Sequence, residues 1–465
     1  MNFGIDLPMI ERLRAGQHED RLERYALVNA GVFDARNGDL LPDRAVLIEG
    51  NRIKAVCQPG DLGEDVIQLN LRGKTVLPGL IDVHVHSEDW HAPLYLAKGI
   101  TSVRDTGCEL EAVLRRRAQW TSSEDMPRLV CTGPLLDNPG NTWPALTQTV
   151  QTPDEARLWV DTLVERGVDQ IKTYAVLDWS CFQAILDQAH QHGKYVVAHL
   201  GKHVNARQAI EAGLDELEHL SGIAEAVWWE RNQEGASWEF FKLWAAIDLE
   251  RANRLIDLIQ EKKTWMAVTR LVWLRLATAW DSRYRAHPQM EYTPRPLREY
   301  WETFSPKNQQ VQRAPKGMPK PSRMDRSQQV AGMAIFTAEL FRREARVLIG
   351  TDAPFPNLLP GFSYHDELQA LLECGLSEKA ALQAATLAGA QALQIDHLVG
   401  TIEAGKMADL IIVDGNPLED MQALQRIDAV IRNGGWLFPQ ELLKKAAEYA
   451  SQAEPSVEKR FDDHY

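Results

Sequence analysis

The sequence predicts an α/β protein: a closed parallel (β/α)8 barrel, or TIM barrel, with a small β-sandwich domain formed from the two ends of the chain. Three observations support this. The chain has 465 residues, apolar strand-like runs alternate with helical stretches through its middle, and short β-type runs without long helices occur near both ends. A single core seldom grows beyond about 250–300 residues, so a large domain with an accessory domain fits the length.

The small domain is expected to use residues 1–76 and 397–465. Between residues 25 and 57, short apolar runs are broken by Asn-Gly and Glu-Gly-Asn, which are turn signals. The same pattern returns in GTIEAGKMADLIIVDG at 400–415. We therefore expect the two segments to pair into one β domain, followed by a helical or polar tail.

The barrel is expected to occupy residues 77–396. This part holds eight apolar runs of strand length, at residues 80–86, 100–105, 128–133, 169–175, 195–200, 216–221, 265–270 and 346–353. Helical patterns such as FQAILDQAHQHG lie between them. Parallel strands that alternate with helices in this way close into a barrel, whose functional groups gather at the carboxyl ends of the strands.

Two connections, residues 222–263 and 272–345, are far longer than the usual link of about 2–6 residues between a strand and a helix. They flank the seventh strand, and the sequence in and beside them is rich in tryptophan, as in VWWE, SWEFFKLW and TRLVWLRLATAW. We expect these insertions to form either a lid that suits an apolar or aromatic substrate, or an interface in a homo-oligomer.

Composition argues against several classes of protein. The chain has 51 Lys and Arg against 65 Asp and Glu, a net charge of −14, which disfavours nucleic acid or anionic lipid as the main partner. No apolar run approaches the roughly 20 residues that span a bilayer, and the N-terminus lacks the apolar core of a signal peptide. The five cysteines include no C-x-x-C pair. We expect a cytoplasmic protein that acts on a small molecule, without a nucleic-acid or membrane partner.

Side chains suited to a metal centre recur at the predicted strand ends. They are His84, His86, Lys172, His199, His219 and Asp352. His84 and His86 are two residues apart on one strand, so their side chains share a face and can converge on one ion, as ligation of Zn²⁺ requires. A lone strand histidine is more often a packing residue, but four histidines and an aspartate at the ends of one barrel point to a metal site.

The motifs that carry these residues resemble the amidohydrolase superfamily of metal-dependent hydrolases, in its imidazolonepropionase-like or prolidase-like branch. The resemblance covers nearly the whole chain. Its motifs are LPGLIDVHVH (77–86), GITSVRDTG (99–107), QIKTYA (170–175), VVAHLG (196–201), AIEAGLDELEH (209–219), LIGTDAP (348–354), PGFSYHDEL (360–368) and GTIEAGKMADLIIVD (400–414). The ordered set of H-x-H, Lys, His, His and Asp is far more specific than any one fragment.

The resemblance implies two divalent metal ions, zinc in the first instance, and a Lys172 that CO₂ has carboxylated so that it bridges them. It also implies that His84, His86 and Asp352 hold one ion and that His199 and His219 hold the other, with a hydroxide between the ions.

The chemistry of the residues agrees with these roles. An ammonium has no lone pair, so Lys172 can join a ligand set only after losing its proton, which burial near cations favours. Two metals lower the pKa of water, and Asp352 can then take the proton from the nucleophile and pass it to the leaving nitrogen. The alternatives are a salt-bridge lysine at the barrel rim and an aspartate in an ordinary turn after a strand.

We therefore predict a hydrolase that cleaves an amide-type C–N bond in a dipeptide, an N-acyl amino acid or a cyclic amide, with a metal-bridging hydroxide as nucleophile. The alternatives are a deaminase or an ester or lactone hydrolase on the same scaffold, and a non-catalytic binding protein. The resemblance argues against a deaminase because related deaminases usually have one metal and lack the carboxylated lysine. The complete ligand set argues against a binding protein.

Other side chains are weaker candidates. Four could contact the substrate, and the alternative for each is a packing or loop residue: Trp143, Tyr174, His203 and Thr269. Asp82 and Asp105 could orient metal ligands or could simply accept hydrogen bonds from the backbone.

Overall fold

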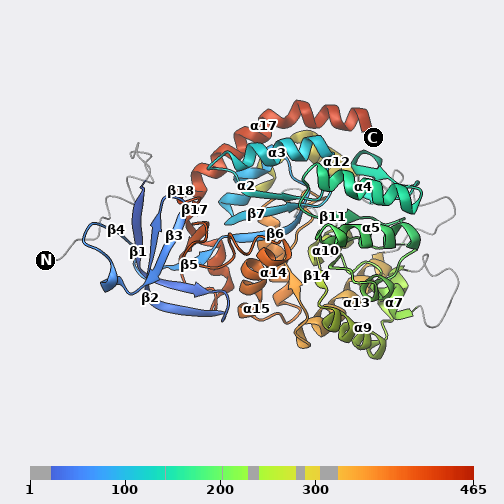
Figure 1. Cartoon of the computed structure of the whole chain (residues 1–465), viewed down its shortest axis with the longest axis horizontal. Coiled ribbons are helices and arrows are strands. Elements are labelled where there is room, and N and C mark those ends of the chain that lie inside the picture. The colour runs from blue at the N-terminus through green and yellow to red at the C-terminus, as the bar shows by residue number, and fades with distance from the viewer. Residues whose placement is uncertain are drawn as a thin grey trace.

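The computed structural model describes residues 22–141, 143–201, 203–228, 240–278, 288–303 and 323–464. Figure 1 shows a sheet at one end of the molecule, built mainly from the N-terminal part of the chain, beside a larger body of strands and helices. These two parts correspond to the predicted small β domain and barrel.

The larger body is built on short parallel strands in the predicted order. They are β6 (Leu80–Val85), β7 (Ile100–Asp105), β8 (Arg128–Cys131), β11 (Ile171–Thr173), β12 (Val196–Ala198), β13 (Glu216–Glu218), β14 (Trp265–Ala267) and β15 (Val347–Leu348). Strands β6 to β8 pair with one another, and so do β11 to β15. Two backbone hydrogen bonds join the groups: Asp169 N donates to Cys131 O at 2.9 Å, and Val83 N donates to Ile349 O at 3.0 Å. The ring is therefore closed, and the predicted α/β barrel is confirmed.

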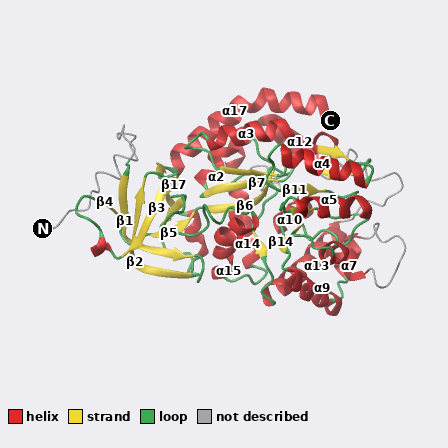
Figure 2. Ribbon diagram, viewed as in Figure 1, coloured by secondary structure: helices red, strands yellow, loops and turns green. Residues whose placement is uncertain are grey.

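Helices surround this ring in Figure 2. They include α3 (Leu110–Thr121), α4 (Pro153–Glu165), α5 (Trp179–Gln191), α6 (Ala206–Glu211), α9 (Leu249–Lys262) and α14 (Phe362–Leu372). The Thr152 and Asp178 side chains cap α4 and α5 by accepting a hydrogen bond from a backbone N–H in the first turn. In α9 the buried residues Ala252, Leu255, Ile256 and Ile259 follow helical spacing.

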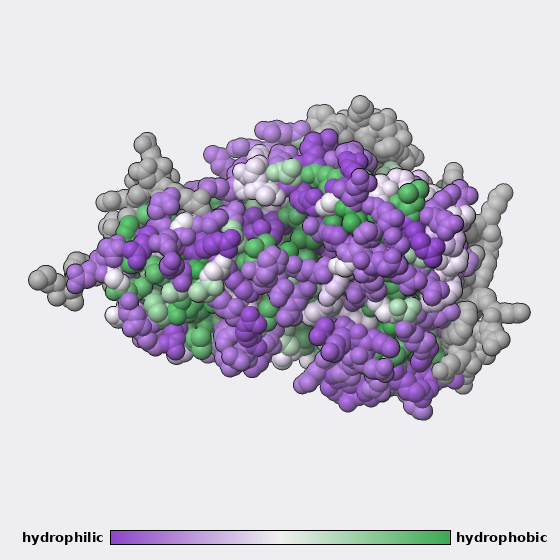
Figure 3. Space-filling view, viewed as in Figure 1, coloured by the Kyte–Doolittle hydropathy of each residue, from purple (hydrophilic) through white to green (hydrophobic). Residues whose placement is uncertain are grey.

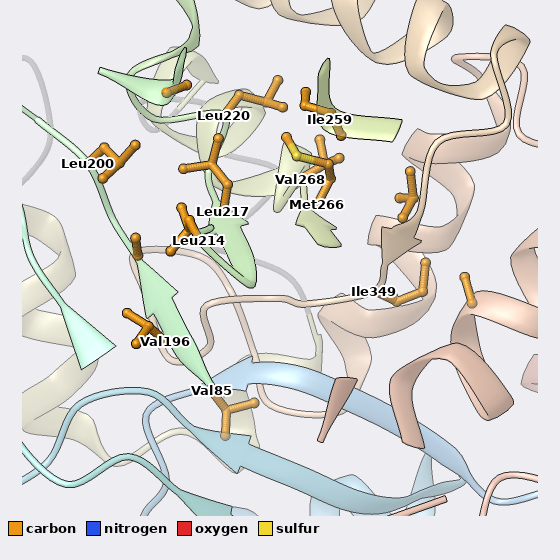
Figure 4. Close-up of a cluster of buried hydrophobic side chains, with 14 of the residues drawn as sticks. Val85, Val196, Leu200, Leu214, Leu217, Leu220, Ile259, Met266, Val268 and Ile349 are labelled. Atoms are coloured by element: carbon orange, nitrogen blue, oxygen red, sulfur yellow. The ribbon is translucent and has the colours of Figure 1, made fainter. Parts of the chain in front are cut away.

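The main core lies between the strands and these helices. Figure 4 shows part of it, where Leu217 of β13 and Met266 of β14 lie near Ile259 of α9. All three side chains are at most 1% exposed. In Figure 3 hydrophilic residues cover most of the visible outer face.

The small domain unites both ends of the chain in one sheet. Its strands are β1 (Arg24–Asp34), β2 (Asp39–Glu49), β3 (Arg52–Cys57), β4 (Ile67–Asn70), β5 (Thr75–Pro78), β16 (Leu410–Val413), β17 (Ile427–Arg432) and β18 (Gly435–Leu437). Strand β5 pairs antiparallel with β16, with Val76 opposite Ile412, which joins the two ends as expected. Buried Arg432 bonds Asp409 at 3.0 Å and donates to Met126 O at 3.1 Å, which ties the sheet to the barrel.

The long connections contain regular helices. They include α7 (Ile223–Trp228), α8 (Phe240–Ala245), α10 (Arg270–Thr278), η5 (Pro288–Tyr292), α12 (Arg295–Thr303) and α13 (Arg323–Arg342). Helices α9 and α13 return the chain to β14 and β15, as in any βα unit. Short strands β9 (Leu135–Asp137) and β10 (Thr147–Thr149) were not predicted.

The expected tail is one helix, α17 (Pro439–His464). Its residues Leu442, Ala446 and Ala450 are buried, and it packs against α2 (Ala92–Ala97), beside which it runs in Figure 1. None of the described helices has both the length and the apolar character needed to cross a membrane.

Candidate metal centre

The six predicted ligands lie at or just beyond the carboxyl ends of barrel strands. His84 and His86 come from β6 and the residue after it, Lys172 from β11, and the others follow β12, β13 and β15. The Oδ1 atom of Asp352 lies 3.1 Å from Nε2 of His84 and 3.1 Å from Nε2 of His86. These three side chains thus direct their donor atoms at one point, as ligands of one divalent ion do.

His199 and His219 form the other side of the cluster. Their ring centroids are 4.8 Å apart, and the His219 ring is 4.6 Å from that of His84. The Nδ1 atom of His199 is buried and has no hydrogen-bond partner among the described residues. An orphaned ring nitrogen beside two other imidazoles fits a site that a metal completes.

Hydrogen bonding fixes the tautomer of His219. The Thr269 hydroxyl donates its hydrogen to Val268 O at 2.9 Å and lies 2.6 Å from Nδ1 of His219. Because that hydrogen is already used, Thr269 Oγ1 accepts from Nδ1–H, which leaves the Nε2 lone pair free for a metal.

Left-handed backbone conformations help to bring these residues together. His219, Thr269 and Asp352 have φ angles of 61°, 44° and 59°. Such conformations cost non-glycine residues on the order of 1–3 kcal/mol each and concentrate at functional sites. At His219 this turn has a visible effect: Nε2 lies 4.0 Å from Glu218 Oε2, although consecutive strand side chains normally point to opposite faces.

Burial sets the protonation of the cluster. It lowers the pKa of His199 to about 3 and holds the pKa of His219 well below its usual value, so these imidazoles are neutral and have lone pairs for a metal. Burial, assisted by the Arg104 charge, holds the pKa of Lys172 well below that of a free lysine. Burial opposes ionisation of Asp352, but the charge and hydrogen bonds of His84 and His86 outweigh it and hold the Asp352 pKa well below its usual value. The donor set fits a divalent cation.

Family models match two parts of the chain. The model described as the amidohydrolase family matches residues 325–437, and that of the NagA composite domain matches residues 24–76. These two segments are therefore similar to proteins of the amidohydrolase family.

Solved structures share the fold of this chain over most of its length. A Xaa-Pro dipeptidase with bound methionine is 21% identical, with a TM-score of 0.65, and the match covers 89% of this chain and 100% of that one. A putative prolidase from Bifidobacterium longum is 24% identical, with a TM-score of 0.68 and coverage of 92% and 100%. A bottromycin amidohydrolase is 21% identical, with a TM-score of 0.68 and coverage of 97% and 95%.

Curated relatives match a much shorter segment. Adenine deaminase 4 of Rhizobium meliloti (strain 1021) is 52% identical over 60 residues, which are 13% of this chain and 9% of that protein. Adenine deaminase 1 of Desulfotalea psychrophila (strain LSv54 / DSM 12343) is 41% identical over 63 residues, which are 14% and 10% of the two chains. The match therefore spans about a tenth of the length of these relatives.

Three of the four candidate substrate residues lie beside predicted ligands, and the fourth is exposed. Trp143 Nε1 donates to the Tyr174 hydroxyl at 3.0 Å, and the Tyr174 ring is 4.6 Å from that of His199, so this pair lies beside a predicted ligand. Thr269 lies beside another predicted ligand, since its hydroxyl contacts His219 Nδ1. His203 is exposed on the connection between β12 and α6.

Asp82 and Asp105 both hold the backbone around the ligands. Asp82 accepts from His84 N at 3.2 Å and from the Thr351 hydroxyl at 2.7 Å, which links β6 to the residue before Asp352. Asp105 accepts from Ser87 N at 2.7 Å, next to His86. Each aspartate therefore holds the backbone beside a predicted ligand.

Sequence reasoning missed Glu218, which is fully buried in the cluster. Its Oε1 atom lies 2.8 Å from Nδ1 of His84, and Oε2 contacts Nζ of Lys172. With His84 and His219 it forms a second group able to hold a cation. The available signal is an acidic residue at a strand end in DELEH, but the alternation of side chains along a strand would place it on the face opposite His219.

Replacing Thr269 with valine should weaken metal binding by about 10- to 100-fold, because His219 Nδ1 would lose the acceptor that fixes its tautomer. Valine keeps the β-branched shape of threonine, so the strain of the left-handed backbone at residue 269 is the same in the variant as in the original protein. Thr269→Ser should retain near-normal affinity. Competition with a metal chelator measures both variants, and equal affinities for valine and serine would contradict this role of the hydroxyl.

Proposed function

We propose that the chain is a metal-dependent hydrolase that cleaves an amide-type C–N bond in a small molecule such as a dipeptide, an N-acyl amino acid or a cyclic amide. The observation that carries this proposal is the convergence of Asp352 Oδ1 on Nε2 of His84 and of His86, at 3.1 Å each, beside two further histidines.

In this proposal His84, His86 and Asp352 hold one divalent ion, His199 and His219 hold a second, and carboxylated Lys172 bridges them. Zinc is the proposed metal because imidazole and carboxylate donors suit it. Two such ions would lower the pKa of water and polarise the scissile carbonyl. Burial supports carboxylation, since the neutral amine that it favours at Lys172 is the form able to react with CO₂.

Asp352 is the proposed proton carrier. Its low pKa keeps the carboxylate ionised, so it can accept the proton of the attacking water. It then delivers that proton to the leaving nitrogen, which is far more basic than a carboxylate once the C–N bond breaks. Both transfers require Asp352 to lie within hydrogen-bond reach of the reacting atoms.

Tyr174 is the best placed of the proposed substrate contacts. Burial raises its pKa, so the hydroxyl stays protonated near neutral pH. Because that oxygen already accepts a hydrogen bond from Trp143, its own hydrogen can be directed to a substrate carbonyl. Trp143 would then be a support for Tyr174 as well as part of the pocket wall. His203 and Thr269 remain proposed contacts with less structural support.

The start of the second insertion supports a lid. Trp273 on α10 donates from Nε1 to His219 O at 3.1 Å, so this segment reaches the metal ligands. Trp280, in the same tryptophan-rich stretch TRLVWLRLATAW, is also proposed as part of the lid and lies outside the described residues. A homo-oligomer and a cytoplasmic location remain proposals that rest on the aromatic insertions and on the charge and cysteine pattern.

The neighbours favour amide cleavage over the alternatives. Descriptions of similar structures include the words Xaa-Pro dipeptidase, prolidase and amidohydrolase. The short match to adenine deaminases keeps deamination as the second candidate. The buried lysine on β11, in contact with the ligand cluster, supports the binuclear hydrolase instead.

The protein prepared with Zn²⁺ and bicarbonate should contain about two metal ions per chain, since six ligands exceed the four positions of one tetrahedral ion. It should cleave members of a library of dipeptides, N-acyl amino acids and aryl amides, with little turnover of lactones or of adenine. Elemental analysis and product detection by mass spectrometry make the test. A single ion in the fully loaded protein would contradict the binuclear proposal, and exclusive turnover of adenine or lactones would contradict amide cleavage.

A further inference from the structure

A group of buried charged side chains adjoins the metal-ligand cluster inside the barrel. Arg104 of β7 and Glu216 and Glu218 of β13 are each at most 1% exposed. Removing a charge from water costs several kcal/mol unless partners compensate, so burial of three charges requires a specific arrangement.

Glu216 holds Arg104 in one orientation. The Nη1 atom of Arg104 donates to Glu216 Oε2 at 2.8 Å, and Nη2 donates to Glu216 Oε1, which makes a bidentate pair. Nη1 also donates to Gln170 Oε1 at 2.8 Å. With the guanidinium fixed in this way, Nη2 lies 3.5 Å from Glu218 Oε1.

Glu218 in turn contacts three of the six predicted ligands. Its Oε1 atom is 2.8 Å from Nδ1 of His84, although not at the angle of a regular hydrogen bond, and Oε2 contacts Nζ of Lys172. Oε2 is also 4.0 Å from His219 Nε2. One carboxylate thus adjoins ligands from β6, β11 and the end of β13.

We propose that Arg104, Glu216 and Glu218 are positioning residues for the metal centre: Glu216 fixes Arg104, Arg104 fixes Glu218, and Glu218 orients His84 and Lys172. This inference rests on the metal centre of the proposed function. It adds that metal affinity depends on a chain of buried charges that reaches two steps beyond the ligands.

The two faces of His84 explain how the network acts. Nε2 faces Asp352 at 3.1 Å, on the metal side, while Nδ1 faces Glu218. The negative charge of Glu218 beside Nδ1 favours the tautomer with the proton on that nitrogen, which leaves the lone pair on Nε2 for a metal. Loss of Glu218 would free the ring to adopt the other tautomer.

The test compares metal affinity in the full-length protein by competition between the protein and a chelator for Zn²⁺, with metal content measured in parallel. Glu218→Gln keeps the size of the side chain and removes its charge, and it should lower affinity by about 10- to 100-fold. Glu216→Gln touches no ligand and should lower affinity by a smaller factor. Both variants, substituted with Co²⁺, should show altered visible absorption bands, because the geometry of the ligands changes.

Asp409→Asn supplies a matched control. Asp409 is also a buried acid paired with arginine, at 3.0 Å from Arg432, but it lies beside the small domain. Its loss should lower the thermal stability of the metal-free protein and leave metal affinity within about twofold of the original, since no ligand adjoins it. An equal loss of affinity in Asp409→Asn would show a general effect of buried charge and overturn the network.

The remaining outcomes separate the two proposals. Unchanged affinity and spectra in Glu218→Gln, with metal bound to the original protein, would overturn the network and leave the proposed function intact. Failure of the original protein to bind metal would overturn the proposed function. If Glu218→Gln does not fold, the test rests on Glu216→Gln. Metal affinity equal to that of the original protein in Glu216→Gln would then contradict the proposed positioning role.

Discussion

Asp352→Asn should lower kcat by about 10²-fold or more while most of the metal stays bound. Asparagine keeps an oxygen close to the position of Oδ1, which lies 3.1 Å from both His84 and His86, so the ligand geometry is largely preserved. It cannot take up a proton at that oxygen. The proton transfer from water to the leaving nitrogen would therefore lose its carrier.

Steady-state kinetics on the best substrate of the library, together with metal analysis of the same sample, measures this effect. His86→Asn is the matched comparison, because it removes a ligand nitrogen and should lose metal and activity together. Near-normal turnover in Asp352→Asn would remove the proposed proton carrier. Loss of both ions would instead make Asp352 a ligand whose charge, rather than its proton transfer, is essential.

The ligands predicted from the sequence share one property: each is tied to an apolar strand. Strands of the barrel are buried on both sides and read as continuous apolar runs, so their ends are easy to recognise, and the chemistry gathers at those ends. The sequence pattern alone therefore assigns His84, Lys172 and Asp352 to one face of the barrel. The closed ring of β6 to β15 confirms the predicted barrel, on which that assignment depends.

Glu218 and Thr269 could not be assigned their places in this way. Both depend on backbone angles that the sequence pattern does not reveal, since His219 and Thr269 adopt left-handed conformations without being glycine. Strand alternation directs Glu218 away from the centre, whereas the turn at His219 lets both side chains face it. Arg104 is a similar case: an arginine within an apolar strand indicates a partner, but Glu216 is 112 residues away in the chain.

The structure of the insertions could be predicted from the sequence only in part. Their length and tryptophan content predicted additional structure around the seventh strand, and helices α7, α8, α10 and α12 are present there. The contact of Trp273 with His219 O depends on where α10 begins, which length and composition do not determine. Helix α10 begins where Glu367 accepts hydrogen bonds from Arg270 N and Leu271 N, at 2.8 and 2.6 Å.

Lys172→Ala should lose the second metal ion and lower activity by at least the factor expected for Asp352→Asn, because the variant has no side chain that CO₂ can carboxylate into a bridging anion. Millimolar acetate or propionate should restore part of both, since a free carboxylate fits the space of the missing side chain. Lys406→Ala is the control. Lys406 is also largely buried, but its Nζ donates to Val399 O at 3.3 Å and it lies near the small domain. This substitution should change neither the metal content nor the activity.

The choice of rescuing molecule separates the two interpretations of Lys172. In the structure its Nζ contacts Glu218, as a lysine that serves only as an ion-pair partner would. If that were its role, the alanine variant would leave the Glu218 charge buried without this cation, and methylamine would restore function where acetate would not. If Lys172 becomes a bridging anion, acetate restores the metal content and methylamine does not, because an added cation repels the divalent ions. Parallel titrations with the two molecules, followed by metal content and kcat, therefore decide between a salt bridge and a carboxylated ligand.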